Sequence, residues 1–403
     1  MMPALLNRIC HIGFHIVEGQ QLASNLVQRF GFELFATRVA EWSKQLAFRR
    51  GDAIFVVNER LKPTEQVPPA SSSGHCKEKG ILYDVEPQHA VSTASNICFE
   101  VEDIPDVSQN LRERGCQLLV PPTTVADEGG SVTYCVVKSV VGNISHTLLD
   151  RSQYSGLFLP GFRVVDETRN EFQADGKVTH FDHITFACPQ GSSQAVVDWY
   201  KNCLGFRRFL IHEQDHVCEG YRIQGPGVGL RLTAMSYSRS DSTLPNRDCK
   251  FVLAESLPGQ SSNQVDAFLK QHGGAGIQHV ALYTSDIVGT AAAMSKSGAN
   301  FFKPPLAYYS DKGKEQEIKR VGLEIGLLRD HGILLDADTV GEGSSESLGP
   351  VRKPYLMQVF TKPLFTEETF FLELIERWGA TGFGEGNVRA LWQSVQNYMD
   401  KYA

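Results

Sequence analysis

Hydrophobic and polar positions follow the same order twice along this chain. In the first half, the alternating segment CHIGFHI (10–16) is followed by apolar residues at helical spacing and then by FGF (30–32). In the second half, HFDHITF (180–186) is followed in the same way by LGF (204–206). Alternation with a period of two predicts a strand, and apolar spacings of three and four predict an amphipathic helix. Each half is therefore expected to begin with a strand, a helix and further strands.

Two further pairs of segments belong to the same repeat. Residues 95–122 and 278–305 both carry Asp-Ile after a strand-like run, a Gly 12 residues after that Asp, and Pro-Pro six residues after that Gly. The segments ISHTLLDR (144–151) and FFLELIER (370–377) close the two halves. The period of about 170 residues is far longer than that of a solenoid, so it indicates a duplicated domain.

The order of these elements predicts an α+β protein with two duplicated domains. We expect a first domain at 7–152, a linker at 153–179, a second domain at 180–338, and closing strands with a C-terminal helix at 355–403. The helix is expected from Asn387 onward, because Leu391, Val395 and Met399 repeat every four residues. Two segments rich in Pro, Ser or Gly, 61–80 and 339–353, are expected to be surface loops.

Composition narrows the class of protein. The 403 residues are 42% hydrophobic and 21% charged, as in folded globular proteins. The net charge is −7 and no Lys/Arg cluster occurs, so we expect no nucleic-acid partner. No apolar run approaches the ~18 residues of a membrane span, so we expect no transmembrane segment. Nine cysteines without a C-x-x-C pair favour a reduced compartment over a disulfide framework.

The N-terminus gives a weak indication of location. The first 17 residues carry Arg8 and no acidic residue, which is typical of a mitochondrial presequence. The alternative is that this segment already belongs to the fold, because Ile9 to Ile16 has the pattern of a strand.

The two halves differ at three aligned positions, and this difference points to a metal. The second half has His183, His279 and Glu373, where the first half has His11, Asn96 and Thr147. Two histidines and one carboxylate on three strands can form a facial triad, which leaves positions open for Fe(II) and O₂ chemistry. We therefore expect a metal site in the second half and none at the aligned position of the first.

The alternative is that these histidines are structural, since the chain has twelve of them. His180 lies three residues before His183, and His146 is next to Thr147, so strand alternation places both on the opposite face. We treat His180 and His146 as structural. The metal hypothesis rests on matched positions in the repeat, not on residue type.

The segments HFDHITFA, GGAGIQHVAL, YLMQVFTKP, FFLELIER and GATGFGEGN resemble the 4-hydroxyphenylpyruvate dioxygenase family of the vicinal oxygen chelate superfamily. The resemblance implies two vicinal oxygen chelate domains of paired βαβββ modules with a C-terminal lid helix. It implies Fe(II) at the three residues above, 4-hydroxyphenylpyruvate and O₂ as substrates, and a homodimer. It also implies a mitochondrial location, with a cytoplasmic one as the alternative, and a place in quinone head-group synthesis.

The resemblance also assigns residues around the metal. It implies a substrate pocket formed by Gln264, Gln278, Gln358, Phe371 and Val388. The glycine-rich segment before the last helix can act as a lid or hinge, with Gly382, Phe383, Gly384, Gly386 and Asn387; the alternative is a simple cluster of helix caps and turns. Amide side chains suit a phenol because they both donate and accept hydrogen bonds.

Three positions depart from the dioxygenase pattern. Ala254 stands where the family has Asn, Leu232 stands in place of a Ser, and Val388 replaces the second aromatic residue that stacks on the substrate ring. An aliphatic residue at 388 resembles the 4-hydroxymandelate synthases. We therefore expect 4-hydroxymandelate as the product, with homogentisate as the alternative. A catalytically weak iron-binding or small-molecule-binding regulatory protein is the alternative of another class.

Overall fold

The computed structural model describes most of the chain. The described residues are 6–17, 19–61, 81–87, 91–165, 177–211, 214–225, 228–238, 249–259, 263–337, 354–380, 382–384, 386–388 and 390. They form two compact units. Unit 1 holds the described residues of Met1–Asn170 and Asp198–Phe206, and unit 2 holds those of Glu171–Val197, Arg207–Ser238 and Thr243–Ala403. No helix in the described part of the chain is long and apolar enough to cross a membrane.

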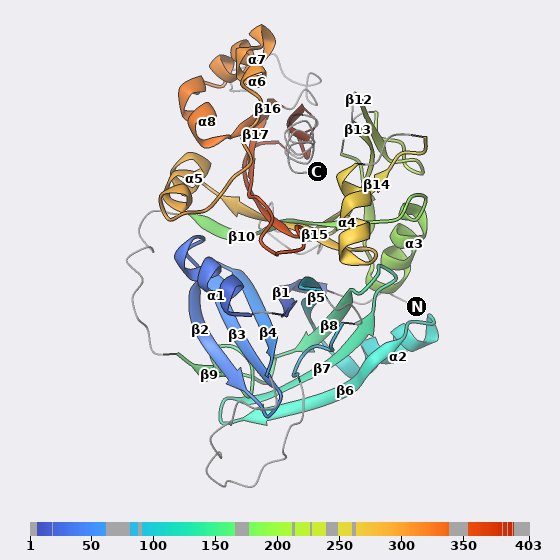
Figure 1. Ribbon diagram of the computed structural model, residues 1–403. Coiled ribbons are helices and arrows are strands. Elements are labelled where there is room, and N and C mark those ends of the chain that lie inside the picture. The colour runs from blue at the N-terminus through green and yellow to red at the C-terminus, as the bar shows by residue number, and fades with distance from the viewer. Residues whose placement is uncertain are drawn as a thin grey trace, which may run out of the picture. The chain divides into compact units, whose positions relative to one another are not determined.

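The first sheet has nine strands in the order β6-β7-β8-β5-β1-β4-β3-β2-β9 (Figure 1). Its elements are β1 (Leu6–Ile16), α1 (Gly19–Gln28), β2 (Glu33–Val39), β3 (Ser43–Arg50), β4 (Ala53–Arg60), β5 (Thr93–Val101), α2 (Ile104–Glu113), β6 (Leu118–Asp127), β7 (Gly130–Lys138), β8 (Ser145–Asp150) and β9 (Arg163–Val164). Helix α2 packs on β6, β7 and β8.

The second sheet has the order β11-β13-β14-β10-β15-β18-β17-β16, and β12 pairs with β13. Its strands are β10 (Val178–Ala187), β11 (Arg207–Phe209), β12 (Tyr221–Gly225), β13 (Val228–Tyr237), β14 (Cys249–Ser256), β15 (Gly276–Thr284), β16 (Leu334–Ala337), β17 (Tyr355–Phe360) and β18 (Phe371–Trp378). The helices are α3 (Ser193–Leu204), α4 (Gln264–His272), α5 (Ile287–Lys296), α6 (Leu306–Ser310), α7 (Lys312–Arg320) and α8 (Ile325–His331).

The two sheets share one topology, which confirms the duplication expected from the sequence. From β2 to β6 the first sheet has the order β2-β3-β4-β1-β5-β8-β7-β6, and each strand has a counterpart in the second sheet at the same place. Both first strands pair in parallel with one neighbour and antiparallel with the other, so each sheet is mixed. The fold is therefore α+β, as predicted.

The repeated Asp-Ile and Gly residues mark the ends of one helix in each half. Asp103 and Asp286 are the N-caps of α2 and α5, and their carboxylates accept hydrogen bonds from the backbone N–H of Asp106 and Gly289. Side-chain oxygens at this position satisfy N–H groups that the helix itself leaves unpaired. Gly115 and Gly298 follow the same helices with positive φ of 79° and 87°, the left-handed conformation that favours glycine. The sequence repeat is thus a repeat of helix caps.

The repeated Pro-Pro leads to different structures. Pro121 and Pro122 lie within β6, an edge strand, where proline is tolerated because its missing N–H need not pair. Pro305 is instead the N-cap residue of α6, and three helices precede the short strand β16. This helical insertion is a difference that the repeat pattern did not predict.

In unit 1, one face of the sheet is covered by the unit's own chain. Two segments outside the strands contribute four buried residues to it: Leu82, Tyr83, Phe158 and Leu159. They share one apolar cluster with residues of β1 to β5, β7 and β8. We call this face of the sheet the inner face. The hydroxyl of Tyr83 donates to the carbonyl of Pro160 at 3.0 Å, which joins these two covering segments.

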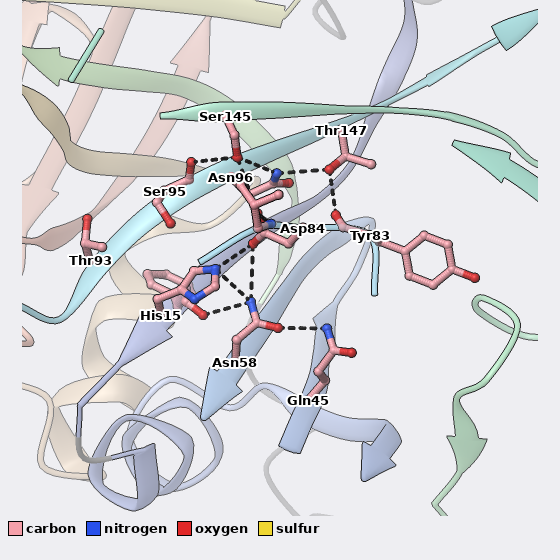
Figure 2. Close-up of polar contacts among 12 residues, drawn as sticks. His15, Gln45, Asn58, Tyr83, Asp84, Thr93, Ser95, Asn96, Ser145 and Thr147 are labelled. Atoms are coloured by element: carbon pink, nitrogen blue, oxygen red, sulfur yellow. Dashed lines mark hydrogen bonds and ion pairs between the residues drawn. The ribbon is translucent and has the colours of Figure 1, made fainter. Parts of the chain in front are cut away.

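Polar side chains fill the rest of this inner face (Figure 2). Asp84 lies at their centre: it contacts His15 Nε2 at 2.8 Å and accepts a hydrogen bond from Ser145 Oγ at 3.3 Å. Asn96 donates to Ser145 Oγ and to Thr147 Oγ1, both at 2.9 Å. Thr147 in turn donates to the carbonyl of Tyr83 at 2.6 Å. Two of the three residues that align with the candidate ligands of the second half, Asn96 and Thr147, are thus engaged in protein hydrogen bonds.

Glycine at position 13 makes this network possible. A Cβ there would lie 3.0 Å from both Asn96 Cβ and Asp84 Oδ2. The aligned residue of the second half is Thr185, because Gly13 pairs with Asn96 and Thr185 pairs with His279. The space that a side chain occupies in unit 2 is taken by Asp84 in unit 1.

Some expectations concern residues outside this description. Most of the expected loops at 61–80 and 339–353, and the C-terminal helix beyond residue 390, lie outside the described residues. The domain boundaries stay predictions. The expected linker, 153–179, is described at 153–165 and 177–179: the first part contributes β9 and the buried Phe158 to unit 1, and the second contains the start of β10 in unit 2.

Phe158 tests whether this segment is part of the core. It is 3% exposed, and its ring lies 5.2 Å from Phe35 and 5.0 Å from Phe162. We expect Phe158→Ala to lower the free energy of unfolding by about 3–5 kcal/mol, because it removes a buried ring and leaves a cavity. Urea unfolding followed by circular dichroism measures this. Leu157→Ala is the control, because Leu157 is 53% exposed; equal effects of the two changes would contradict the assignment.

Candidate metal centre

His183, His279 and Glu373 come together from three neighbouring strands of the second sheet. His183 on β10 pairs with Ala281 on β15, and Ala281 pairs with Glu373 on β18. His279 lies two residues before Ala281, so it projects from the same face of β15. The small side chain of Ala281 lies between the outer two residues and leaves room for them to meet.

The three side chains point their metal-binding atoms at one another. Glu373 Oε2 lies 3.4 Å from His183 Nε2 and 3.5 Å from His279 Nε2, and one ligand atom from each residue lies within 4.8 Å of the others. The side chains are 3%, 12% and 1% exposed for His183, His279 and Glu373. Two imidazoles and one carboxylate are the donor set of non-haem Fe(II) sites that keep positions open, so these residues fit Fe(II).

An irregularity in β10 orients His183. The pairing of β10 with β15 shifts between Phe181 and His183, which brings Asp182 to the same side as the histidine that follows it. Asp182 Oδ1 lies 2.8 Å from His183 Nδ1. A carboxylate at this distance holds the proton on Nδ1 and leaves Nε2 free for a metal.

Arg377 holds Asp182 in place. It forms two hydrogen bonds of 2.8 Å to the two oxygens of Asp182, and both side chains are buried. Burial by itself would raise the pKa of Asp182, but the charge and hydrogen bonds of Arg377, together with His183, hold that pKa well below its usual range. Asp182 therefore stays a carboxylate.

The two histidines have opposite tendencies. Burial lowers the pKa of His183, but the charges of Glu373 and Asp182 outweigh it and the net pKa is raised. Burial lowers the pKa of His279 well below its usual range, and the neighbouring His183 adds to this. His279 is therefore a neutral imidazole, the form that binds metals.

Glu373 is held by an amide chain. Gln358 on β17 donates from Nε2 to Glu373 Oε1 at 2.9 Å and to the carbonyl of Phe383 at 3.3 Å. Its Oε1 accepts a hydrogen bond of 2.9 Å from Asn387. Glu373 Oε1 is thus engaged with protein, and Oε2 faces the histidines.

The predicted lid residues lie against the same site. Phe383 packs edge-on against His183 with ring centres 4.9 Å apart, and Arg377 donates to the carbonyl of Gly382. Gly384 has φ 69°, and a Cβ there would lie 2.4 Å from Gln358 Oε1. Gly386 donates from its backbone N to Asp336 at 2.9 Å. This segment thus contacts Arg377 and Gln358, which hold the surroundings of His183 and Glu373. Its movement as a lid stays a prediction.

The predicted substrate residues lie at different places, and two of them contact His279. Phe371 stacks on His279 with ring centres 4.6 Å apart, and Gln278 Oε1 lies 3.3 Å from His279 Nδ1. Val388 packs instead in an apolar cluster with Phe383, Leu232 and Ala254, among others. Gln264 is the first residue of α4 and is half-buried.

The two histidines expected to be structural have partners of their own. His180 stacks on Tyr283 with ring centres 4.8 Å apart. In unit 1, His146 Nδ1 lies 3.3 Å from the carbonyl oxygen of Ile97, whereas Thr147 bonds to Asn96. His180 does not belong to the His183–His279–Glu373 group. The expected placement on the opposite face is wrong, because the shift in pairing at Asp182 puts His180, which pairs with Tyr283, on the same face as His183.

Known proteins carry the same combination of sequence and fold. The family model for the Glyoxalase/Bleomycin resistance protein/Dioxygenase superfamily matches residues 180–325. The 4-hydroxyphenylpyruvate dioxygenase-like protein of Rattus norvegicus is 46% identical over 98% of both chains. The chain belongs to the family of 4-hydroxyphenylpyruvate dioxygenase-like proteins. The human protein of the same name is 45% identical over 98% of this chain and 97% of its own.

More distant relatives agree with this family. The 4-hydroxyphenylpyruvate dioxygenase of Xenopus tropicalis is 27% identical over 97% of this chain and 91% of its own. The fold resembles that of a triple mutant of 4-hydroxymandelate synthase from Streptomyces coelicolor, with a TM-score of 0.74, 21% identity, and coverage of 99% of this chain and all of that one. The vicinal oxygen chelate fold is therefore shown for this dioxygenase-like chain.

Two residues of the site were missed in the sequence. Strand alternation places Asp182 and His183 on opposite faces, so only the irregularity in β10 reveals their contact. Arg377 did carry a signal: it lies four residues after Glu373 on one strand, an even spacing that places both on one face.

The first prediction for this site concerns the asymmetry between the two halves. We expect Glu373→Ala to lose bound iron, because a methyl group neither ligates nor balances Fe(II). Thr147→Ala should keep its iron but lose about 1–3 kcal/mol of stability, because the buried carbonyl of Tyr83 loses its donor. Plasma mass spectrometry of the purified proteins measures iron. Equal iron loss in both variants would contradict the asymmetry.

The second concerns the buried ion pair. We expect Asp182→Asn to lower the free energy of unfolding by about 3–5 kcal/mol, because Arg377 keeps a buried charge without its counter-ion. Iron affinity should fall about 10- to 100-fold, because His183 loses its orienting partner.

The pH dependence and a control sharpen this test. The folded pKa of Asp182 lies below its unfolded value, so its contribution is complete above about pH 5 and is lost only as pH falls below that. Asp182 also helps to raise the pKa of His183, so in iron-free protein the difference from wild type should be largest near about pH 6 and should decrease as pH rises through the raised pKa of His183. Glu219→Gln breaks an exposed pair with Arg222 and should change neither quantity.

Proposed function

We propose that this protein is an Fe(II)-dependent dioxygenase that converts 4-hydroxyphenylpyruvate and O₂ into 4-hydroxymandelate and CO₂. The grouping of His183, His279 and Glu373 supports an iron enzyme. The family relation supports the substrate, because 4-hydroxyphenylpyruvate dioxygenases cover almost the whole chain. The product follows from the apolar surroundings of Val388.

His183, His279 and Glu373 would hold the metal. When bound, Fe(II) supplies the redox chemistry that activates O₂ and offers positions for an α-keto acid. Asp182 and Gln278 face the Nδ1 atoms of the two histidines, and Gln358 holds one oxygen of Glu373. The chain's own contribution is thus to fix three ligands in one orientation before substrate arrives.

Phe371 would position the aromatic ring of the substrate. It lies beside His279 and packs in a cluster with Phe302, Phe360 and Leu334. Offset or edge contacts between rings contribute about 0.5–1.5 kcal/mol beyond burial. Gln264 is proposed to hydrogen-bond the substrate, and Phe383 to exclude water above His183.

The apolar residues around Val388 would decide the product. Leu232 and Ala254 are paired neighbours on β13 and β14, and they share one apolar cluster with Val388 and Phe383. This wall offers no polar side chain at the two positions where the resemblance expects Ser and Asn. A valine also leaves room for the ring to tilt, which brings the benzylic carbon, not the ring, nearest the metal. Changes in pose of ~1 Å alter such outcomes strongly.

The second candidate is a protein of another class, which binds iron or a small molecule without turnover. Leu232 and Ala254 favour it, because these apolar side chains cannot hydrogen-bond the substrate. O₂ uptake with Fe(II) and 4-hydroxyphenylpyruvate separates the two. No uptake by iron-loaded protein at saturating substrate would favour the binding protein.

We further propose a mitochondrial location and a homodimer. Both rest on the family resemblance alone, because most of the acid-free segment before Glu18 is strand β1 (Leu6–Ile16) of the first sheet. Cell fractionation and light scattering of the purified protein test these proposals.

The prediction for function concerns Val388. We expect wild-type protein to yield mainly 4-hydroxymandelate, with CO₂ formed and O₂ consumed in equal amounts. Val388→Phe should shift part of the product toward homogentisate, because a second ring would hold the substrate ring toward the metal. Mass spectrometry of the products measures both. Val388→Ile is the matched control and should leave the product unchanged. Homogentisate as the main product of the wild type would contradict the proposal.

A further inference from the structure

Unit 1 contains a second group of candidate metal-binding side chains. Cys10, His11 and Cys98 each offer one ligand atom, and the three atoms lie within 4.8 Å of one another. The residues are 5%, 3% and 0% exposed. His11 Nδ1 lies 3.4 Å from Cys10 Sγ. This group lies on the sheet that lacks the His183–His279–Glu373 set.

The same strand irregularity that builds the site in unit 2 builds this one. The pairing of β1 with β5 shifts between Ile9 and His11, which brings the neighbouring residues Cys10 and His11 to one side. His11 pairs with Cys98 on β5. The arrangement matches Asp182 and His183 on β10, where His183 pairs with Ala281. The positions of Asp182 and Ala281 in the second sheet are thus occupied by Cys10 and Cys98 in the first.

The donor set differs in kind from that of unit 2. Two sulfurs and one imidazole are soft ligands, which select Cu(I) or Zn(II) over Fe(II). The surroundings are apolar: Cys10 and Cys98 share a cluster with Phe35, Val56 and Phe158, among others. Among the residues that the structure describes, no fourth His, Cys, Asp or Glu joins the group.

The number of ligands distinguishes a Cu(I) site from a Zn(II) site. Protein Zn(II) is almost always four-coordinate, and a three-ligand site fills its open position with water. Thr147, which pairs with Cys98 on the neighbouring strand, already bonds to Asn96 and to the carbonyl of Tyr83, so it is a poor partner for such a water. We propose that Cys10, His11 and Cys98 bind one Cu(I) ion in unit 1. The site uses none of the residues of the proposed dioxygenase centre, so the two proposals stand or fall separately.

Competition for Cu(I) tests the proposal on the full-length chain. All proteins carry Cys203→Ser, because Cys116 and Cys203 form another close thiol pair, with their sulfurs 2.9 Å apart. Reduced protein is titrated anaerobically with Cu(I) against the chromophoric chelator bicinchoninate. We expect one tightly bound equivalent, and X-ray absorption should show two sulfur ligands and one nitrogen ligand.

Variants locate the ion. Cys98→Ser and Cys98→Ala should each weaken Cu(I) binding by at least about 100-fold. Removing a hydrogen-bond partner of a metal ligand lowers metal affinity about 10- to 100-fold, and removing the ligand itself should lower it more. Cys98→Ala reproduces the residue at the matched position of unit 2, so it should fold if the serine variant does not. Cys135→Ser is the matched control, because Cys135 is a buried strand cysteine of the same sheet outside the group.

Three results would overturn the proposal. The first is no tight equivalent of Cu(I) in the parent protein. The second is equal affinity in Cys98→Ala and in Cys135→Ser, with circular dichroism and iron content unchanged in both. The third is tighter binding of Zn(II) than of Cu(I).

Discussion

The candidate metal centre depends on one buried ion pair. Arg377 neutralises Asp182, and Asp182 faces the Nδ1 of His183, so a charge on β18 orients a histidine on β10. The same guanidinium donates to the carbonyl of Gly382, at the start of the predicted lid. A buried carboxylate without this partner would be costly. The pair therefore joins a candidate ligand, two strands and the closing segment in one arrangement.

Duplication supplied two sheets of one topology, and the side chains on their inner faces then diverged. In unit 2, the positions around Ala281 hold His183, His279 and Glu373. In unit 1, Asn96 and Thr147 are held by one another and by the covering segment at Tyr83. The positions of His279 and Glu373 in the candidate iron site are thus filled by packed polar side chains, Asn96 and Thr147, in the first half.

Family membership and chemistry answer different questions about this protein. The close relatives at 45–46% identity establish what kind of chain it is. The reaction depends on a few side chains, since one fold can support several functions. In the proposed reaction, Phe371 contacts an aromatic substrate, and the apolar residues Leu232, Ala254 and Val388 would disfavour ring hydroxylation.

The sequence by itself determined the duplication, the α+β class and the three candidate ligands, because helix caps and strand periods are local and the second half could be compared with the first. It did not reveal the contact of Asp182 with His183, since a shift in strand pairing is invisible to a rule of alternation. It also missed the helices α6 to α8 after Pro305, and the covering of the first sheet by Tyr83 and Phe158. These features depend on contacts between residues far apart in the chain, which only the tertiary structure decides.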